Sequence, residues 1–152
     1  MLQRSDRGNG GEPSMTWEDL NELNELHRER KSVEEMLERL RASVQRTSPN
    51  LDGMPHGGQQ RDIMAEYAAN YDEALRRLSE IDLRLTDRID RIENELRTAP
   101  LNPRQIAVVW SRHAEGMSWG KICHELYYSK AGVFKIYKQA LTIMGIRKSR
   151  HK

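Results

Sequence analysis

The sequence predicts an all-α protein, with a long antiparallel, coiled-coil-like helical hairpin followed by a three-helix helix-turn-helix domain. Two long segments repeat apolar residues at intervals of three and four, which is typical of helices that pack along one seam. The C-terminal third holds two helix-capping serines close together. Hydrophobic residues make up only 37% of the chain and charged residues 32%, so any core must be thin and run along helices.

The N-terminal region predicts a tail and then a helix start. Residues 1–15 are rich in Gly, Ser and charge, and their small apolar content predicts a disordered tail. Thr16 is a predicted N-cap. Glu18 and Asp19 follow it in the first turn, where the helix dipole favours acids. The helix should reach about Arg46.

This first helix carries a heptad seam that one polar residue interrupts. Steps of three and four hold once Arg30 is accepted as a polar member, and such a seam is typical of a coiled-coil strand. Its apolar members are Leu23, Leu26, Val33, Leu37, Leu40 and Val44.

Residues 47–61 read as a loop because prolines and paired glycines interrupt the helical pattern. At its centre, Met54–Gly58 could form a contact site or could simply join two antiparallel helices. Both interpretations stay open.

A second long helix is predicted from about Asp62 to Arg97, with Asp82 as the polar member of its seam. In an antiparallel hairpin spanning 16–99, Asp82 would face Arg30, and we expect the two to pair. The seams could equally pair between chains, so a homodimer through residues 16–97 also stays open. The apolar members are Tyr71, Leu75, Leu78, Leu85, Ile89, Ile92 and Leu96.

A domain boundary is predicted near residue 100. Asn102 can cap a new helix, Pro103 suits its first position, and Gln105 completes the spacing of a capping box. The helix Pro103–Glu115 should present Ile106, Val109, Trp110 and His113 on one face. It would support a helix-turn-helix domain of residues 100–146, followed by a basic tail, 147–152.

The stretch Gly116–Met144 predicts a short helix, a tight turn and a longer helix. Ser118 caps the first helix, whose buried stripe is Ile122, Cys123 and Leu126. Ser129 caps the second, eleven positions later. Tyr127 and Tyr128 form the turn; we expect Tyr127 to point to the core and Tyr128 to a phosphate or solvent. Trp119 is expected to pack between the first two helices of this domain rather than to stack on a base.

The second of these helices has two distinct sides. Its inward residues should be Val133, Ile136, Tyr137, Ala140, Leu141 and Met144. Its outward residues, mostly cationic or small, should be Lys130, Ala131, Phe134, Lys135, Lys138 and Thr142. This arrangement favours contact with duplex DNA over a merely solvated face.

Charge divides the chain in two. Residues 101–152 hold ten Lys and Arg against two acids, whereas residues 1–100 hold fifteen against twenty-one. A basic block beside an acidic one suggests a nucleic-acid face joined to a segment that avoids nucleic acid.

Enzymatic and metal chemistry are not expected. Cys123 and His124 are adjacent, so on a helix they point about 100° apart, and no spaced ligand pair accompanies them. No phosphate-binding glycine loop or nucleophile motif is present, and no cofactor is predicted. A single cysteine, with no signal peptide or membrane span in the sequence, predicts a cytoplasmic protein.

The chain resembles the ArpU-like phage transcriptional regulators, whose C-terminal region is similar to the fourth region of bacterial sigma factors. The resemblance rests on MPHGG at Met54–Gly58, on the long helix after it, and on GMSWGKICHELYYSKAGVFKIYKQAL at Gly116–Leu141. These stretches cover about two thirds of the chain. The resemblance implies a phage or prophage activator of late genes, acting at the nucleoid of a bacterial host cell. No segment similar to the promoter-melting region of sigma factors is found.

The resemblance maps the residues after Ser129 into the major groove. Phe134 departs from the polar residue usual at its position, which puts its base contact in doubt. The complete set of predicted DNA contacts is Lys121, Tyr128, Ser129, Lys130, Ala131, Phe134, Lys135 and Lys138.

Three functions stay open at this stage. The first is a sequence-specific transcriptional regulator that binds duplex DNA, with contact to host RNA polymerase left open. The second is a small terminase subunit, which would recognise packaging sites and assemble a ring. The third is a coiled-coil adaptor whose basic end binds protein.

Overall fold

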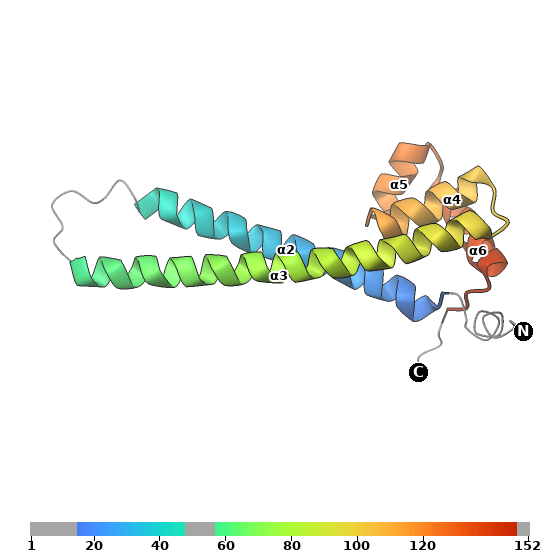
Figure 1. The fold of residues 1–152 in the computed structure, drawn as a ribbon. Helices are drawn as coiled ribbons and strands as arrows, with labels where there is room; N and C mark the ends of the chain where they lie inside the picture. Colours follow the sequence, from blue (N-terminus) through green and yellow to red (C-terminus); the bar gives the residue numbers. More distant parts are fainter. Residues whose placement is uncertain (1–14, 48–56, 149–152) are drawn as a thin grey trace, which may run out of the picture. The chain divides into compact units, whose positions relative to one another are not determined.

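The computed structural model describes residues 15–47 and 57–148, giving only the backbone for 46, 47 and 57–61. These residues are helical and form no strand (Figure 1), which confirms the all-α prediction. None of these helices is long and apolar enough to cross a membrane. The elements are α2 (Trp17–Thr47), α3 (Gly57–Thr98), α4 (Pro103–Val109), the π-helical turn η2 (Trp110–Ala114), α5 (Trp119–Leu126) and α6 (Lys130–Met144).

The described residues form two compact units. Residues 26–84 form one, and residues 15–25 together with 85–148 form the other. We call the first the distal unit and the second, which holds α4, α5 and α6, the α4–α6 unit. The division falls inside α2 and α3, whereas the sequence predicts a boundary near residue 100. That boundary stays a prediction.

The start of α2 agrees with the predicted cap. The Thr16 hydroxyl oxygen accepts the Asp19 backbone N–H at 3.2 Å, and the Thr16 N–H donates to the Asp19 carboxylate at 2.9 Å. Most of the predicted tail, 1–14, lies outside the described residues, but Met15 is buried. It therefore does not belong to a tail: Met15 and the buried Leu20 occupy the two positions of a hydrophobic staple around the cap.

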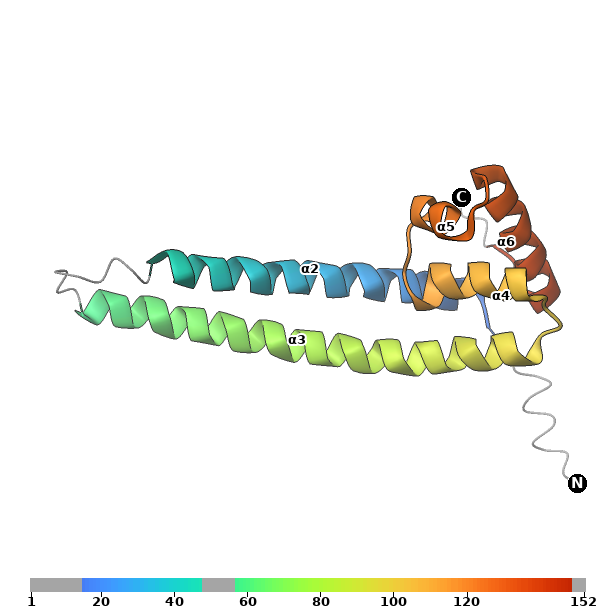
Figure 2. The same cartoon turned by 90° about the horizontal axis from the view of Figure 1, so that it is seen from above.

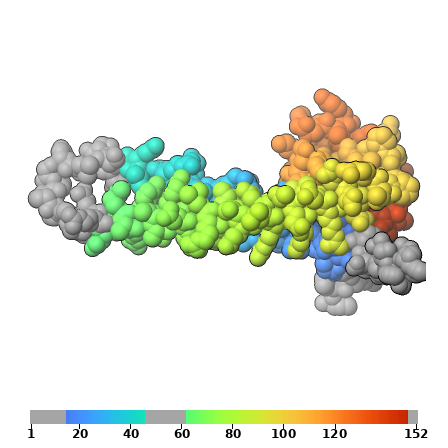
Figure 3. All heavy atoms as spheres, in the orientation of Figure 1, coloured from blue at the N-terminus to red at the C-terminus, as the bar shows by residue number. Residues whose placement is uncertain are grey.

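In the distal unit, α2 and α3 pack along one another, and their side chains fill the space between the two helices (Figures 2 and 3). The buried residues are Leu26, Val33, Leu37, Ala74 and Ile81. Three polar contacts flank this seam.

The predicted pairing of Arg30 with Asp82 is confirmed. The Arg30 Nε lies 2.6 Å from Asp82 Oδ1, and Arg30 also pairs with Glu34 one turn along α2. The hydrogen bond to Asp82 is the main cause that raises the pKa of Arg30. Both side chains of the interhelical pair stay partly exposed, at 35% and 46%. The pair therefore lies at the edge of the seam rather than within it.

The other two polar contacts also join α2 to α3. Glu29 pairs with Arg77 at 4.0 Å, and the Arg41 guanidinium donates to the Tyr71 hydroxyl at 3.3 Å. Glu29, the earlier residue of α2, thus contacts the later residue of α3, Arg77, whereas Arg41 contacts the earlier Tyr71.

The seam differs from the predicted one on α3. Leu75 is 42% exposed, while its neighbour Ala74 is buried and Ile81 takes the next buried position. Adjacent residues on a helix point about 100° apart, so the choice of Ala74 moves Leu75 to the edge. On α2, Leu40 and Val44 are only half-buried.

The predicted loop 47–61 is too long at both ends. Thr47 is the last residue of α2, and α3 begins at Gly57, five residues before the predicted start. Residues 59–61 are Gln, Gln and Arg, good helix formers that allow the helix to begin earlier. The glycines take the first turn, which has few intrahelical bonds to lose. Residues 48–56, including most of Met54–Gly58, lie outside the described residues.

The α4–α6 unit combines the start of α2 and the end of α3 with the C-terminal helices. Leu20, Leu23, Ile92 and Leu96 are buried in it, and Arg88 bonds to Glu22 at 2.7 Å. Both α4 and α5 pack against α6. Their packing forms the part of the core that determines which side of α6 faces outward.

We predict that replacing both Arg30 and Asp82 by Leu keeps or raises the melting temperature and broadens the distribution of oligomers. Partly exposed ion pairs contribute about 0 to 1 kcal/mol, whereas two leucines extend the apolar seam and remove the polar pair that specifies its register. Circular dichroism melts and light scattering measure the two effects.

The matched control is Glu73→Leu with Arg76→Leu. This pair lies within α3, at 2.9 Å, and bridges no helices. Its replacement adds the same side chains without altering an interhelical contact. A double-Leu variant at 30 and 82 that melts lower, at unchanged mass, would contradict the prediction.

Candidate nucleic-acid interface

The supporting helix begins as predicted. The Asn102 side chain accepts the Gln105 N–H at 2.8 Å, the Gln105 side chain accepts the Asn102 N–H at 2.9 Å, and Pro103 takes the first turn. This reciprocal capping box explains why Gln105 is buried although it is polar.

The same helix does not continue as an α-helix to Glu115. The α-helical part ends at Val109, and residues 110–114 form a π-helical turn. The buried residues are Gln105, Val108, Val109, His113 and Ala114, whereas Ile106 and Trp110 are half-buried. The inward face is thus shifted by one residue from the predicted one until the wider π turn brings His113 inward.

The two predicted serine caps are confirmed. The Ser118 hydroxyl oxygen accepts the Lys121 N–H at 3.1 Å and starts α5; the Ser129 hydroxyl oxygen accepts the Gly132 N–H at 3.0 Å and starts α6. Each satisfies a backbone donor that a helix start leaves without an intrahelical partner. The turn between the helices spans residues 127–129.

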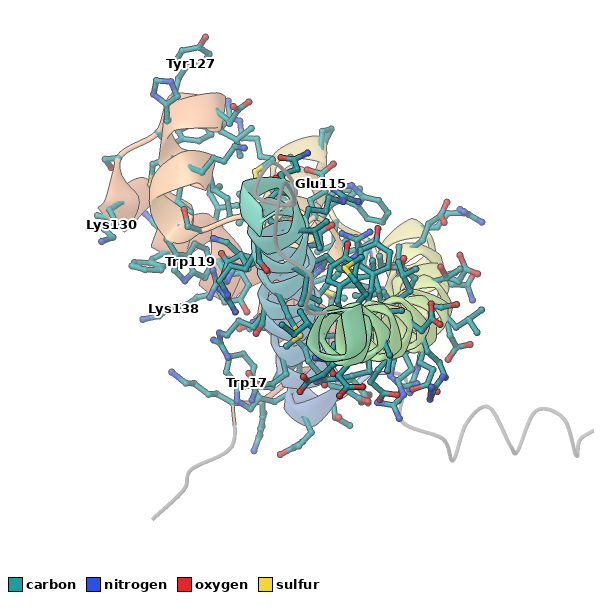
Figure 4. The ribbon with its side chains drawn as sticks, turned by 90° about the vertical axis from the view of Figure 1, so that its left-hand side faces the viewer. Trp17, Glu115, Trp119, Tyr127, Lys130 and Lys138 are labelled. Atoms are coloured by element: carbon teal, nitrogen blue, oxygen red, sulfur yellow. The ribbon has the colours of Figure 1, made fainter. Side chains whose placement is uncertain are left out.

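The prediction for the tyrosine pair is wrong for Tyr127. Its side chain is 91% exposed and points away from the neighbouring helices (Figure 4). Tyr127 adopts a left-handed backbone conformation with φ of 62°, and the next N–H, that of Tyr128, bonds to the Cys123 carbonyl at 3.1 Å. This C-capping turn reverses the chain and directs the Tyr127 side chain outward.

The inner face of α6 agrees in part with the predicted one. Val133, Tyr137, Ala140 and Leu141 are buried, while Ile136 and Met144 are half-buried. The helix ends at Gly145, whose φ is 77°, and the Ile146 N–H bonds back to the Leu141 carbonyl at 2.9 Å. Ile146 is buried, so the core extends to the residue before the predicted basic tail.

The outer face of α6 carries the exposed cations. Lys130, Ala131, Lys135, Lys138 and Thr142 are all exposed. Figure 4 shows Lys130 and Lys138 extending away from the body of the unit on the same side. Arg147 and Lys148 are exposed as well, and Lys148 lies over the ring of Trp17 at 5.6 Å.

Phe134 differs from the other predicted contacts because it is half-buried. Its ring meets that of Trp119 edge to face, with centroids 4.8 Å apart, and Trp119 meets Tyr137 in the same way at 4.8 Å. The Arg112 guanidinium lies 4.6 Å from the Trp119 ring centroid. Trp119 therefore contacts the π-helical turn, which agrees with the predicted packing between the first two helices, and it also packs on α6. Phe134 helps to anchor α6.

A buried polar pair lies beneath this aromatic cluster. His113 is 1% exposed, and its Nε2 lies 2.8 Å from the Tyr137 hydroxyl. Burial raises the pKa of Tyr137 well above its ordinary value, so the phenol keeps its proton. The pair joins the π-helical turn to α6.

The remaining predicted contacts lie on α5 and in the turn. Lys121 is exposed, and Tyr128 is half-buried with the Arg104 guanidinium 5.9 Å from its ring centroid. Two arginines that contact aromatic rings here were not predicted from the sequence: Arg104, which is exposed at the start of α4, and Arg112. No periodic pattern marks either residue, because each is brought to its partner by the packing of separate helices.

Metal binding receives no support within the described ranges, which hold no group of three His, Cys, Asp or Glu able to bind a metal ion. Cys123 is a free, half-buried thiol on α5. Comparisons with models of protein families, with curated proteins and with solved structures found no match for this chain. The resemblance to ArpU-like regulators therefore stays a prediction.

We predict that Ile122→Ala destabilises the fold by about 2 to 5 kcal/mol, because it leaves a cavity at a fully buried position. Ile136→Ala, at a half-buried position, should cost less. Urea denaturation followed by circular dichroism compares the two variants. Equal losses would show that the two positions are packed alike.

We predict that Tyr137→Phe costs about 1 to 3 kcal/mol of unfolding free energy, because it removes the hydroxyl that His113 Nε2 contacts in the core. Tyr127→Phe removes a hydroxyl at an exposed position and should change stability by no more than about 0.5 kcal/mol. The same denaturation experiment measures both. A Tyr137→Phe variant as stable as the parent would mean that this hydrogen bond adds nothing to the free energy of unfolding.

Proposed function

We propose that this protein is a sequence-specific regulator of transcription that binds duplex DNA through α5 and α6, acting as a helix-turn-helix carried by an antiparallel helical hairpin. The observation that carries the proposal is the outer face of α6. Lys130, Lys135 and Lys138 are exposed on a helix whose other side is buried against α4 and α5. The protein belongs in the cytoplasm of a bacterial host in this proposal, with a prophage or phage origin implied by the resemblance alone.

The helix-turn-helix assignment is supported by local geometry. A helix of eight residues, a three-residue turn and a helix of fifteen residues follow one another, each helix with its own serine cap. The shorter helix packs against the longer one, as does the supporting helix α4. In proteins with this motif the second helix enters the major groove with its N-terminal part.

The hairpin assignment is supported by the order of contacts in the distal unit. Arg30 of α2 contacts Asp82 of α3, while Arg41, further along α2, contacts the earlier residue Tyr71. Contacts ordered in this way are those of antiparallel helices. The exposed acids of the hairpin would then disfavour DNA contact away from α6.

Charge makes the outer face of α6 suited to an anionic ligand such as duplex DNA. The chain has no Asp or Glu from Lys130 to its end, so nothing on α6 itself would repel a phosphate backbone. Each phosphate contact releases condensed counterions, which gives about 0.9 in the slope of log K against log salt. Phosphate contacts would supply most of the affinity and position α6.

Base readout would then fall to side chains near the middle of the exposed face. Lys135 can reach guanine acceptors in the major groove, and the small Ala131 lets the helix approach closely. Phe134, packed on Trp119, would mainly hold α6 in orientation. This division assigns affinity, readout and support to different residues of one helix.

We predict that Lys135→Ala weakens binding to a selected duplex by about 1 to 3 kcal/mol and lowers the salt slope by about one unit, at unchanged melting temperature. The control is Lys31→Ala, which removes an exposed lysine of α2 in the distal unit and should change neither. Fluorescence anisotropy titrations at several salt concentrations measure both quantities, on a duplex first selected from random sequence by this protein.

Three results would redirect the proposal. A Lys135→Ala variant that binds like the parent at every salt concentration would remove α6 from the interface. A parent protein that gives no salt-dependent gel shift with duplex DNA would instead favour a protein-binding adaptor. If DNA is bound but light scattering finds a large ring, recognition of packaging sites would replace transcriptional regulation.

A further inference from the structure

The turn between α5 and α6 carries, in a left-handed conformation, a residue type that the fold alone does not explain. Among the described residues, Tyr127 is the one non-glycine residue with a positive φ, at 62°. Helix ends of this type usually carry Gly, because a Cβ is strained in the left-handed region. The chain does use glycine at the corresponding end of α6, where Gly145 has a φ of 77°.

Burial offers no compensation for this strain. The Tyr127 side chain is 91% exposed, the highest value among the exposed large apolar residues. In Figure 4 it extends from the end of α5 without approaching a neighbouring helix. A large aromatic residue thus occupies a position that glycine would fill with less strain, and the fold gains no buried surface from it. Such an outlier points to a role outside the fold.

We propose that Tyr127 is a further contact to the DNA backbone, with its phenol donating a hydrogen bond to a phosphate oxygen. This inference rests on the proposed function. Tyr127 precedes Tyr128, Ser129 and Lys130, so it lies at the end of α6 that would enter the major groove. Tyrosine hydroxyls are common donors to phosphate, and such contacts determine the register of the protein on the duplex.

A phosphate suits this position better than a protein partner does. Lys130 is exposed three residues later, and Lys121 is exposed on the preceding helix. The nearest exposed acid along the chain, Glu125, lies on α5 before the turn, and none follows it. Along the chain, exposed lysines stand on both sides of Tyr127 and would attract an anionic backbone, whereas a docking site for protein would be expected to include a wider apolar patch.

The inference predicts opposite effects on stability and binding for Tyr127→Gly. Relief of the strained conformation should raise the melting temperature by about 2 to 4 °C. Loss of the phenol should weaken binding to the selected duplex by about 3- to 10-fold. Because the lost group is uncharged, the salt slope should stay unchanged, unlike that of Lys135→Ala.

Tyr127→Phe separates the hydroxyl from the ring and the DNA contact from the backbone strain, and Leu83→Ala is the control. Tyr127→Phe keeps the ring but removes the hydroxyl, so it should weaken binding nearly as much as Tyr127→Gly does. Leu83→Ala removes an exposed side chain of α3, 70% exposed, and should affect neither binding nor melting. Nitration by tetranitromethane provides a direct measurement: the selected duplex should protect Tyr127, while Tyr67 and Tyr71 of α3 react at the same rate with and without DNA.

The outcomes distinguish this inference from the function on which it rests. If the parent binds DNA and Tyr127→Gly binds equally well, or if DNA leaves nitration of Tyr127 unchanged, the phosphate contact is wrong and the proposed function stands. If the parent binds no DNA at low salt, both are overturned. Weaker binding at an unchanged salt slope, together with protection of Tyr127, supports the contact.

Discussion

The packing of Tyr137 is the contact on which the candidate interface most depends. Its ring meets Trp119 of α5, and its hydroxyl lies 2.8 Å from His113 of the π-helical turn. Two neighbouring elements therefore hold the same side chain, which fixes the rotation of α6 about its own axis. With successive residues 100° apart, that rotation decides that Lys135 and Lys138 face outward. A rotation by one residue would replace cations with apolar side chains on the exposed face.

The π-helical turn is needed for this arrangement. In the α-helical part of the supporting helix, Gln105, Val108 and Val109 face inward. The wider turn then places both His113 and Ala114 in the core and leaves Trp110 half-buried, with its indole N–H donating to Glu115 at 3.2 Å. The contact between the π-helical turn and α6 is therefore made by the polar and aromatic side chains of His113 and Tyr137 rather than by aliphatic side chains. A hydrogen-bonded pair is directional, so it restricts the position of α6 more than aliphatic packing would.

The distal unit follows a different physical rule. Two helices can bury only a narrow stripe, so their polar contacts lie at its edges, partly exposed. Arg30 with Asp82 and Glu29 with Arg77 join the helices in this way. Such pairs add little stability, but they disfavour shifted alignments of the two helices, in which like charges would face one another or a charge would face an apolar side chain.

The sequence by itself determined the local features of this protein. Caps depend on residues three apart, so Thr16, Asn102, Ser118 and Ser129 could be found by spacing alone, and heptad seams gave the two long helices. The pairing of Arg30 with Asp82 also followed, because each seam has one charged member, the two charges are opposite, and their positions face one another in an antiparallel hairpin. Tertiary structure decided the rest: that Ala74 rather than Leu75 is buried, that Phe134 packs on Trp119, and that Tyr127 points outward. The first two outcomes depend on helix rotation, which contacts between residues of separate helices determine. The third depends on a left-handed turn conformation that a tyrosine seldom adopts, so the residue type does not predict it.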